Sequence, residues 1–482
     1  MELLSPAGNV EKLSYAYAYG ADAAYIGLKK FSLRVKADNF YEDEYKKVIE
    51  LKNKYPGKRL HCALNIIFHD DEIDLLKANL DYFKQYPIDA FIVQDIGIVP
   101  LLQKEFPNVQ LHLSTQASCV NSESVKLYKS LGFSRIVLGR EISLDQIKRI
   151  KDSVPDMELE AFCHGAMCIA YAGRCLMSAY LTGRSAQSGF CSHTCRWNFK
   201  LQGAKELVQS GKLVLEEEER KGEYYPVFEG DDFTAVLSSK DLCMIDYLKD
   251  MKDAGVDSLK IEGRMKSVYY VAMVTRAYRK ALDAIEGKIT QKEAEPYIAE
   301  LENVSHREST TGFYFNKAEA DKTTSGASDS KYYLAAQMGK EISGKDFDCL
   351  YQTGQNNYKK FKDELDSMHP SAREARLKDL EIHTDRNVVA FEKKEGWKLY
   401  ECVALNKIQA DSEIEFVSPD FVSLTAKPGE WELISSETGN KLNWVCDNHP
   451  CVIYTKYDLP SSTLLRILDP DFVEGQIRDT GR

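Results

Sequence analysis

The stretch MELLSPAGNVEKLSYAYAYGADAAYIGL, residues 1–28, contains the pattern on which the fold prediction rests. Two short apolar runs, Met1 to Ser5 and Ala23 to Leu28, flank a helical stretch. Strand, helix and strand in this order are typical of a parallel α/β fold, because parallel strands need a crossover between them. The stretch lacks the basic and apolar segments of a secretory signal, so we expect a cytoplasmic protein.

The same pattern repeats through the first 290 residues or so. Amphipathic helical stretches, such as Asp71 to Gln85 and Ser122 to Leu131, separate the strand candidates. Eight strand–helix units in this length predict a (β/α)8 TIM-like barrel, because an open doubly wound sheet usually has about five or six strands. The other six strand candidates are Leu60 to Ile66, Ala90 to Gln94, Gln110 to Ser114, Arg135 to Gly139, Leu159 to Cys163 and Ser258 to Glu262.

The spacing of the strands breaks once, between the seventh and the eighth. The long insertion there, residues 165–255, holds most of the clustered cysteines and the aromatic and basic run Arg196 to Lys200. In a barrel, such an insertion emerges from the carboxyl face, where catalytic loops are built. A long loop in this position is more often functional than not, so we expect it to carry part of the site.

The length of 482 residues suggests two or three domains. We assign residues 1–335 to the barrel domain with its insertion and residues 336–386 to a charged helical linker or insertion. In residues 387–482, alternating runs such as Val388 to Phe391 and Cys451 to Tyr454 are separated by turn residues. This pattern predicts a small C-terminal β-barrel domain.

The composition, with 44% hydrophobic and 28% charged residues, is that of a soluble globular protein. The sequence has no apolar run of about 18 residues, so no contact with a membrane is predicted. With 63 basic and 74 acidic residues, the net charge is −11 at pH 7. This charge opposes binding to polyanions over the whole surface, although it permits a local basic groove.

The cysteines are unevenly distributed, because five of the twelve fall within 33 residues and another, Cys243, follows further on. In a large chain without an export signal, we expect thiols or metal ligands rather than disulfides. Thiolates that converge from one loop suit an iron–sulfur cluster or a Zn2+ ion, and the wide spacing favours the cluster. Buried, inert thiols are the other interpretation. The clustered residues are Cys163, Cys168, Cys175, Cys191 and Cys195.

Polar residues also recur where the predicted barrel strands end, and side chains at these ends point into the barrel mouth. Arg140 and Arg264, with Arg34 as a third donor, would hold a small anion there. Each residue taken alone also fits a cap or a loop hydrogen bond, and Arg34 also fits a surface charge. The other members of this set are Asn65, Ile66, Gln94, Asp95, Ser114, Thr115, Gln116, Glu141, His164, Glu262 and Gly263.

Familiar hydrolase and nucleotide-binding motifs do not occur: we find no HExxH, GxSxG, P-loop or GxGxxG. Cys163 and His164 could be drawn as a nucleophilic pair, but adjacent residues on a strand face opposite sides. The run Arg196 to Lys200 mixes cations and aromatics as nucleic-acid surfaces do. A packed Trp197 with solvated neighbours is the other interpretation.

Several motifs together resemble the peptidase U32 family, the collagenase-like proteases. The resemblance covers residues 1 to about 335 and resumes more weakly over the C-terminal β domain. The motifs that carry it are Glu160 to Cys168, Gly173 to Ser178, Cys191 to Trp197, Ser239 to Cys243 and Lys260 to Arg264.

The resemblance implies more than peptide hydrolysis. Similar members include a tRNA hydroxylase that forms 5-hydroxyuridine at the wobble position with prephenate, an rRNA cytidine hydroxylase and proteins of ubiquinone hydroxylation. In the last group four cysteines hold a 4Fe-4S cluster. Carried over by motif, the ligands here would be Cys168, Cys175, Cys191 and Cys243, with Cys195 as a rival.

The resemblance therefore implies a tRNA hydroxylase with a prephenate-like small carboxylate as cosubstrate and tRNA as partner. The β domain and the run Arg196 to Lys200 would hold the RNA backbone. Catalytic candidates are His164, Glu160 and Glu262. A U32 peptidase and a non-catalytic assembly protein with zinc or a cluster are the alternatives.

Overall fold

The computed structural model describes residues 1–28, 40, 43–168, 239–315, 330–382, 388–446 and 449–470, with short pieces between 170 and 235. The described residues up to 315 form one compact unit, and those from 330 onward form a second. No helix in these residues is long and apolar enough to cross a membrane.

The first unit is built on a closed barrel of parallel strands. Each strand pairs with the next along the chain, and β13 pairs with both β7 and β1, which closes the ring. All eight predicted strands are present, so the predicted TIM-like barrel is confirmed. The strands are β1 (Glu2–Pro6), β2 (Ala23–Ile26), β3 (Arg59–Leu64), β4 (Ala90–Val93), β5 (Gln110–Leu113), β6 (Arg135–Val137), β7 (Glu158–Ala166) and β13 (Ser258–Ile261).

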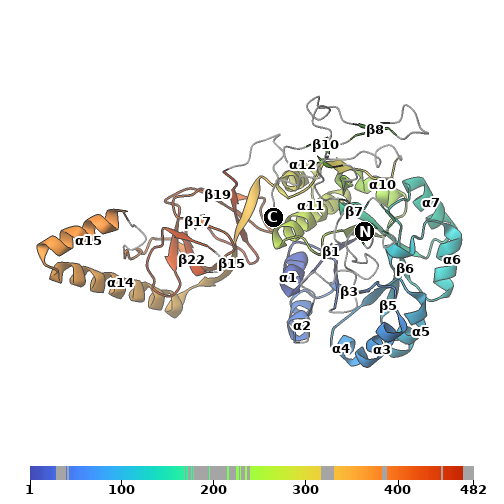
Figure 1. Ribbon diagram of the computed structural model, residues 1–482, viewed down its shortest axis with the longest axis horizontal. Helices are drawn as coiled ribbons and strands as arrows, with labels where there is room; N and C mark the ends of the chain where they lie inside the picture. The colour runs from blue at the N-terminus through green and yellow to red at the C-terminus, as the bar shows by residue number, and fades with distance from the viewer. Residues whose placement is uncertain are drawn as a thin grey trace. The chain divides into compact units, whose positions relative to one another are not determined.

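Helices surround the ring of strands, as Figure 1 shows. Polar residues begin several of them: Asn9 accepts a hydrogen bond from the backbone N–H of Lys12 at 2.8 Å, and Ser143 forms a capping box with Gln146. The helices are α1 (Val10–Ala18), α2 (Tyr45–Lys54), α3 (Asp70–Ala78), α4 (Leu80–Lys84), α5 (Val99–Glu105), α6 (Ser122–Ser130), α7 (Leu144–Ser153), α10 (Leu248–Asp253), α11 (Val268–Ile285) and α12 (Gln291–Ala299).

The insertion between β7 and β13 adds a strand to the barrel sheet. Strand β12 (Asp241–Cys243) pairs antiparallel with β7, and β14 (Ser309–Thr310) pairs with β12. The buried Asp241 carboxylate accepts hydrogen bonds from the backbone N–H and the Nε of Arg307, both at 3.1 Å. This ion pair joins β12 to the segment that leads into β14, while backbone pairing places β12 beside the carboxyl end of β7. The insertion's other strands are β8 (Val214–Glu216), β9 (Tyr224–Pro226), β10 (Phe228–Glu229) and β11 (Thr234–Ala235).

The second unit is a curled antiparallel sheet of seven strands that forms half a barrel, in the order β19-β18-β23-β15-β16-β22-β20. Its core contains Trp431, Phe416 and Ile453, all of which are buried. The strands are β15 (Tyr332–Ile342), β16 (Lys398–Ala404), β18 (Ile414–Val417), β19 (Leu424–Ala426), β20 (Trp431–Ser435), β22 (Pro450–Thr455) and β23 (Leu464–Leu468), beside the ribbon of β17 (Ile408–Gln409) and β21 (Trp444–Val445).

Two helices follow β15 and project together from this sheet (Figure 1). They are α14 (Gly344–Ser367) and α15 (Pro370–Ile382), and an ion pair of 2.8 Å between Arg373 and Asp366 joins them. The segment 336–386, for which charged helix was expected, therefore begins with strand and continues as these two helices.

Candidate functional site

The structure describes four of the five cysteines proposed as metal ligands. Cys168 is exposed, whereas Cys175, Cys195 and Cys243 are half-buried. Cys191 lies outside the described residues, as does Arg34. The complete ligand set therefore stays a prediction.

Two of these cysteines belong to neighbouring segments of the chain. Cys243 ends β12, where it lies opposite His164 of β7. Cys168 follows the end of β7, and the Ser239 hydroxyl donates a hydrogen bond of 2.7 Å to the Met167 carbonyl beside it. Burial raises the pKa of the Cys243 thiol above its ordinary value. The pairing of β7 with β12, which periodicity did not predict, therefore brings two distant parts of the cysteine motif into adjacent segments.

His164 lies in a buried hydrogen-bond cluster around the hydroxyl of Tyr278 on α11. Its Nδ1 is 3.3 Å from that hydroxyl, which donates a hydrogen bond of 2.7 Å to the Cys163 carbonyl. The backbone N–H of Met244 donates to the same hydroxyl at 3.2 Å. Burial lowers the pKa of His164 to about 4, so the imidazole is neutral at neutral pH. The arrangement indicates a positioning role that ties β7 to α11.

Cys163 does not have the surroundings of a nucleophile. Its Sγ lies 3.5 Å from the Lys260 carbonyl oxygen, and it is fully buried. Burial raises the pKa of this thiol well above its ordinary value, whereas a nucleophilic cysteine needs a lowered pKa. A Cys163 and His164 dyad therefore gains no support from the structure.

The polar residues predicted for the barrel mouth do lie at the carboxyl ends of barrel strands. Arg140 follows β6, and its Nη2 is 3.0 Å from the Glu262 carboxylate, which follows β13. Its Nη1 donates to the Ala166 carbonyl at 2.8 Å, and the guanidinium stacks on the Phe162 ring at 3.9 Å from the centroid. Arg140 is thus held in place at the mouth, with Glu262 as its ionic partner.

The other mouth residues follow β3, β5 and, like Glu262, β13. Asn65 follows β3, and the buried Gln116 lies in the short turn after β5, where it accepts a hydrogen bond of 3.2 Å from Ser114. Arg264, also buried, follows β13. A Cβ added to Gly8 would lie 2.3 Å from the Arg264 carbonyl oxygen, so only glycine permits this approach.

An ion cluster that the sequence patterns did not predict lies inside the barrel. The Glu160 carboxylate of β7 lies 2.7 Å from Lys260 Nζ and 3.0 Å from Arg135 Nη1. Arg135 also pairs with Glu2 of β1 and with Glu158. The signal in the sequence was a charged residue inside otherwise apolar strands. Glu160, a predicted catalytic candidate, is therefore bound within this cluster.

In this cluster the ion pairs lower the pKa of the carboxyl groups by more than burial raises it. Burial by itself raises the pKa of Glu2, but hydrogen bonding and charge from Arg135 lower it to about 2. In the same way, burial raises the pKa of Glu160, and the positive charges of Lys260 and Arg135 lower it below its ordinary value. Both carboxylates are therefore ionised at neutral pH.

Two histidines adjoin this cluster, His61 of β3 and His112 of β5. Their rings are T-shaped with centroids 4.8 Å apart, and both are fully buried. With Glu160 they form the one group of converging metal donors found in the described part of the chain.

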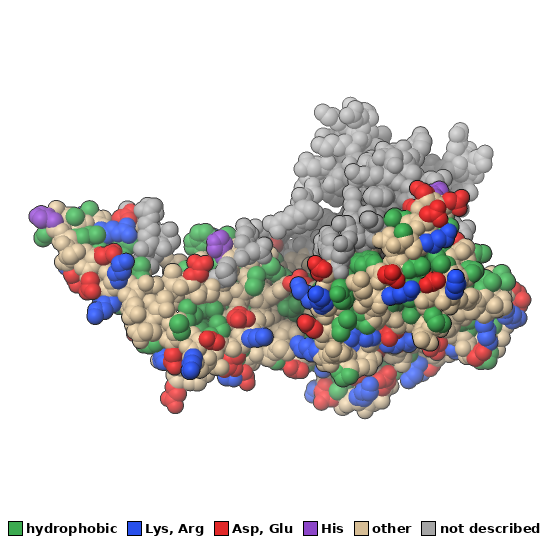
Figure 2. Space-filling model, turned by 90° about the horizontal axis from the view of Figure 1, so that it is seen from below, with side chains coloured by type: hydrophobic (Ala, Val, Ile, Leu, Met, Phe, Trp, Pro, Cys, Tyr) green, Lys and Arg blue, Asp and Glu red, His purple; other side chains and the backbone are tan. Residues whose placement is uncertain are grey.

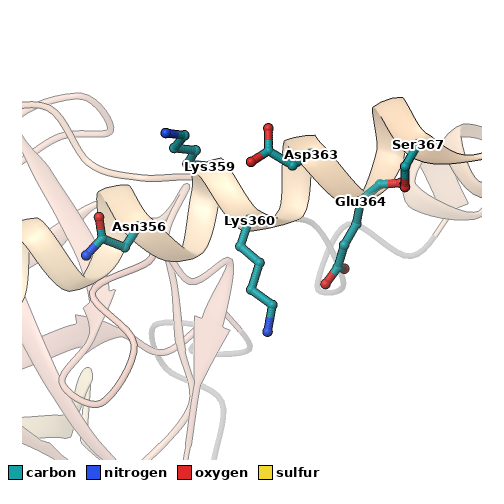
Figure 3. A pocket seen from close by; sticks show the side chains of 6 residues that line it. All are labelled: Asn356, Lys359, Lys360, Asp363, Glu364 and Ser367. Atoms are coloured by element: carbon teal, nitrogen blue, oxygen red, sulfur yellow. The ribbon is translucent and has the colours of Figure 1, made fainter.

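A hollow of about 430 Å3 lies on α14 of the second unit (Figure 3). All of its lining residues come from this one helix, and none belongs to the predicted site. On the face shown in Figure 2, basic and acidic side chains lie interspersed over the described residues. The hollow is lined by Asn356, Lys359, Lys360, Asp363, Glu364 and Ser367.

Comparison with known proteins agrees with the motifs. The chain is 38% identical over 338 residues to "tRNA hydroxylation protein P" of Escherichia coli (strain K12), an alignment that covers 65% of this chain and 74% of that protein. It is 39% identical over 320 residues to "tRNA hydroxylation protein P1" of Bacillus subtilis (strain 168), covering 65% and 70%. It is 35% identical over 349 residues to "23S rRNA 5-hydroxycytidine C2501 synthase" of Escherichia coli (strain K12), covering 71% and 49%.

Residues 8–324 match the family described as peptidase family U32. This match includes the barrel strands from β2 to β13 and the insertion with its cysteines. The expectation drawn from the motifs is confirmed: the chain belongs to peptidase family U32.

Proposed function

We propose that this chain is an RNA-modifying hydroxylase that forms 5-hydroxyuridine at the wobble position of tRNA. The observation that carries the proposal is its 38% identity over 338 residues to a protein named for tRNA hydroxylation. A relative named as an rRNA 5-hydroxycytidine synthase supports a pyrimidine base in RNA as the substrate class. A flipped wobble base would reach a barrel mouth more easily than a paired base.

The mouth offers a binding place for a small carboxylate of the prephenate type. Arg140 is stacked on Phe162 and held by the Ala166 carbonyl, so its guanidinium is already oriented. A ligand carboxylate would compete with Glu262 for this guanidinium, with Arg264 and, outside the described residues, Arg34 as further donors. Displaced from Arg140, Glu262 would be a carboxylate beside the ligand and is the acid–base candidate.

The proposed cofactor is a 4Fe-4S cluster held by Cys168, Cys175, Cys191 and Cys243, with Cys195 as the rival ligand. Soft sulfur donors suit such a cluster, and Cys168 and Cys243 come from adjacent segments. When bound, the cluster would supply the redox chemistry that ring hydroxylation needs and side chains lack. A Zn2+ ion is the alternative. The iron content of the anaerobically purified protein would distinguish the cluster from zinc.

Binding of tRNA would be local, because the net charge of the chain is −11. Interspersed charges on the face in Figure 2 agree with this. The run Arg196 to Lys200, proposed as a contact, lies outside the described residues. We therefore propose that RNA affinity falls with salt, but with a modest slope.

Mass spectrometry of tRNA nucleosides from a deletion strain tests the proposal. We expect 5-hydroxyuridine and its derivatives to disappear and to return with the wild-type gene. Cys168→Ser and Arg140→Gln should fail to restore them. Arg149→Gln on the exposed side of α7 is the matched control and should restore them fully. Unchanged hydroxyuridine in the deletion strain would overturn the proposal.

A further inference from the structure

We propose that His61, His112 and Glu160 form a binding site for a divalent transition-metal ion inside the barrel, separate from the cysteines. The three side chains come from β3, β5 and β7, which are alternate strands of the ring. Alternate strands of such a barrel contribute side chains to one interior layer. One donor atom from each residue lies within 4.8 Å of the other two.

The two histidines have buried ring nitrogens without hydrogen-bond partners among the described residues. His61 and His112 are both 0% exposed, and neither Nδ1 nor Nε2 of either ring is satisfied. Buried polar atoms are normally hydrogen-bonded or bound to an ion, because an unsatisfied one costs free energy. Four such atoms in two neighbouring rings therefore point to a missing ligand between them.

The histidines are in the protonation state that metal binding requires. Burial lowers the pKa of His61 to about 4 and that of His112 well below its ordinary value. Both rings are therefore neutral at neutral pH and have a lone pair for a metal. The Glu160 carboxylate is ionised, and its two oxygens provide about four acceptor positions, of which Lys260 and Arg135 occupy two.

The charged groups around the site carry no net positive charge that would exclude a cation. Arg135 is surrounded by three carboxylates, those of Glu2, Glu158 and Glu160, while Lys260 is the second buried cation. These five groups carry a net charge of −1, and Arg59, which pairs with Glu2 at 3.4 Å, brings the total to zero. An added divalent ion would therefore enter a neutral set of charges rather than a positive one.

The donor set indicates the class of metal. Two imidazole nitrogens and one carboxylate suit Zn2+, Co2+ or Fe2+ better than Mg2+ or Ca2+, which prefer oxygen. Metal bonds of about 2.0–2.1 Å would require the three side chains to turn inward from their present separation. Because all three residues are buried, we expect the ion to enter as the barrel folds.

Refolding with Co2+ tests the site independently of any hydroxylation. The full-length protein with serine in place of all five proposed sulfur ligands is unfolded in guanidinium with a chelator, freed of the chelator and refolded with Co2+. The replaced residues are Cys168, Cys175, Cys191, Cys195 and Cys243. We expect about one bound Co2+ per chain, with visible d–d bands and no sulfur-to-metal charge-transfer band. Adding His61→Phe or His112→Phe should abolish metal binding. His369→Phe, at an exposed position of the second unit, should not change the metal content.

X-ray absorption of the same cobalt protein provides a second readout if the phenylalanine variants fail to refold. A spectrum that shows scattering from two imidazole rings bound to the cobalt would support the site. No bound Co2+, sulfur-only coordination, or full metal content in a folded His61→Phe/His112→Phe protein overturns it and indicates a buried water instead. Since none of these readouts involves RNA, failure here leaves the proposed hydroxylase function untouched.

Discussion

At the scale of single residues, Arg135 organises the barrel interior. Its guanidinium, 2% exposed, contacts carboxylates from β1 and from two positions of β7. Buried charges are tolerated only when they are paired, because the free energy of removing them from water must be recovered. The layer of the barrel interior around Arg135 is therefore charged, and its stability depends on every one of these charges having an ionic partner.

Glu160→Gln is expected to destabilise the protein by about 3–5 kcal/mol, because it leaves Lys260 buried without its anionic partner. Glu158→Gln changes a carboxylate that is 44% exposed and should cost less than about 1 kcal/mol. Urea unfolding of both variants measures the difference. Equal losses of unfolding free energy would show that the buried ion pair contributes no more than the exposed one.

The acid sensitivity of the fold should depend on Glu2, whose pKa falls from an ordinary value of 4.5 to about 2. A carboxylate with a lowered folded-state pKa stabilises the fold above its unfolded pKa, and this contribution disappears as the pH falls toward the folded pKa. We therefore expect part of the stability to be lost between pH 4.5 and about 2. Glu2→Gln should flatten this slope in unfolding curves, and an unchanged slope would contradict the assignment.

At the scale of secondary-structure elements, β12 connects the insertion to the barrel. It runs antiparallel to β7, and the buried ion pair of Asp241 with Arg307 joins its other side to the segment before β14. Its last residue is Cys243, so the position of this thiol depends on the strand. The element that carries a proposed ligand is thus fixed by charge as well as by backbone pairing.

Asp241→Asn should loosen β12, because the amide replaces a charge-assisted bond to Arg307 with a weaker one. Hydrogen exchange at the backbone amides of residues 241–243 should become at least tenfold faster. Asp246→Asn, an exposed change in the same segment, should leave exchange unaltered. If both variants behave alike, the ion pair does not hold the strand.

At the scale of the whole molecule, each unit has a hydrophobic core of its own. The core of the second unit includes Trp431, which is 1% exposed, and residues from each long strand of the sheet. A unit with its own core can fold by itself. The barrel with its insertion and the curled sheet are therefore separate structural units within the described residues.

Residues 330–474 expressed alone should fold cooperatively, with a sigmoidal thermal transition followed by circular dichroism. Trp431→Ala should lower the stability of this fragment by about 3–5 kcal/mol, because it empties a buried site. Trp444→Ala, at a position that is 49% exposed, is the matched control and should have little effect. A fragment without a transition would show that the unit needs the barrel to fold.

The sequence by itself determined the barrel, because alternation of apolar strands and amphipathic helices is a local pattern. It also placed Arg140, Glu262 and Arg264 at strand ends, where position along the strand predicts the barrel mouth. The cysteine motif indicated the family. Each of these inferences needs only residues that are close together in the chain or a motif read directly from it.

Only the tertiary structure decided which side chains meet. Glu2 and Arg135 lie 133 residues apart along the chain, and the closure of the ring brings them together. His61, His112 and Glu160 converge for the same reason, and β12 is aligned with β7 by pairing that no periodicity encodes. Contacts of this kind depend on strand register and barrel closure, which are properties of the whole sheet.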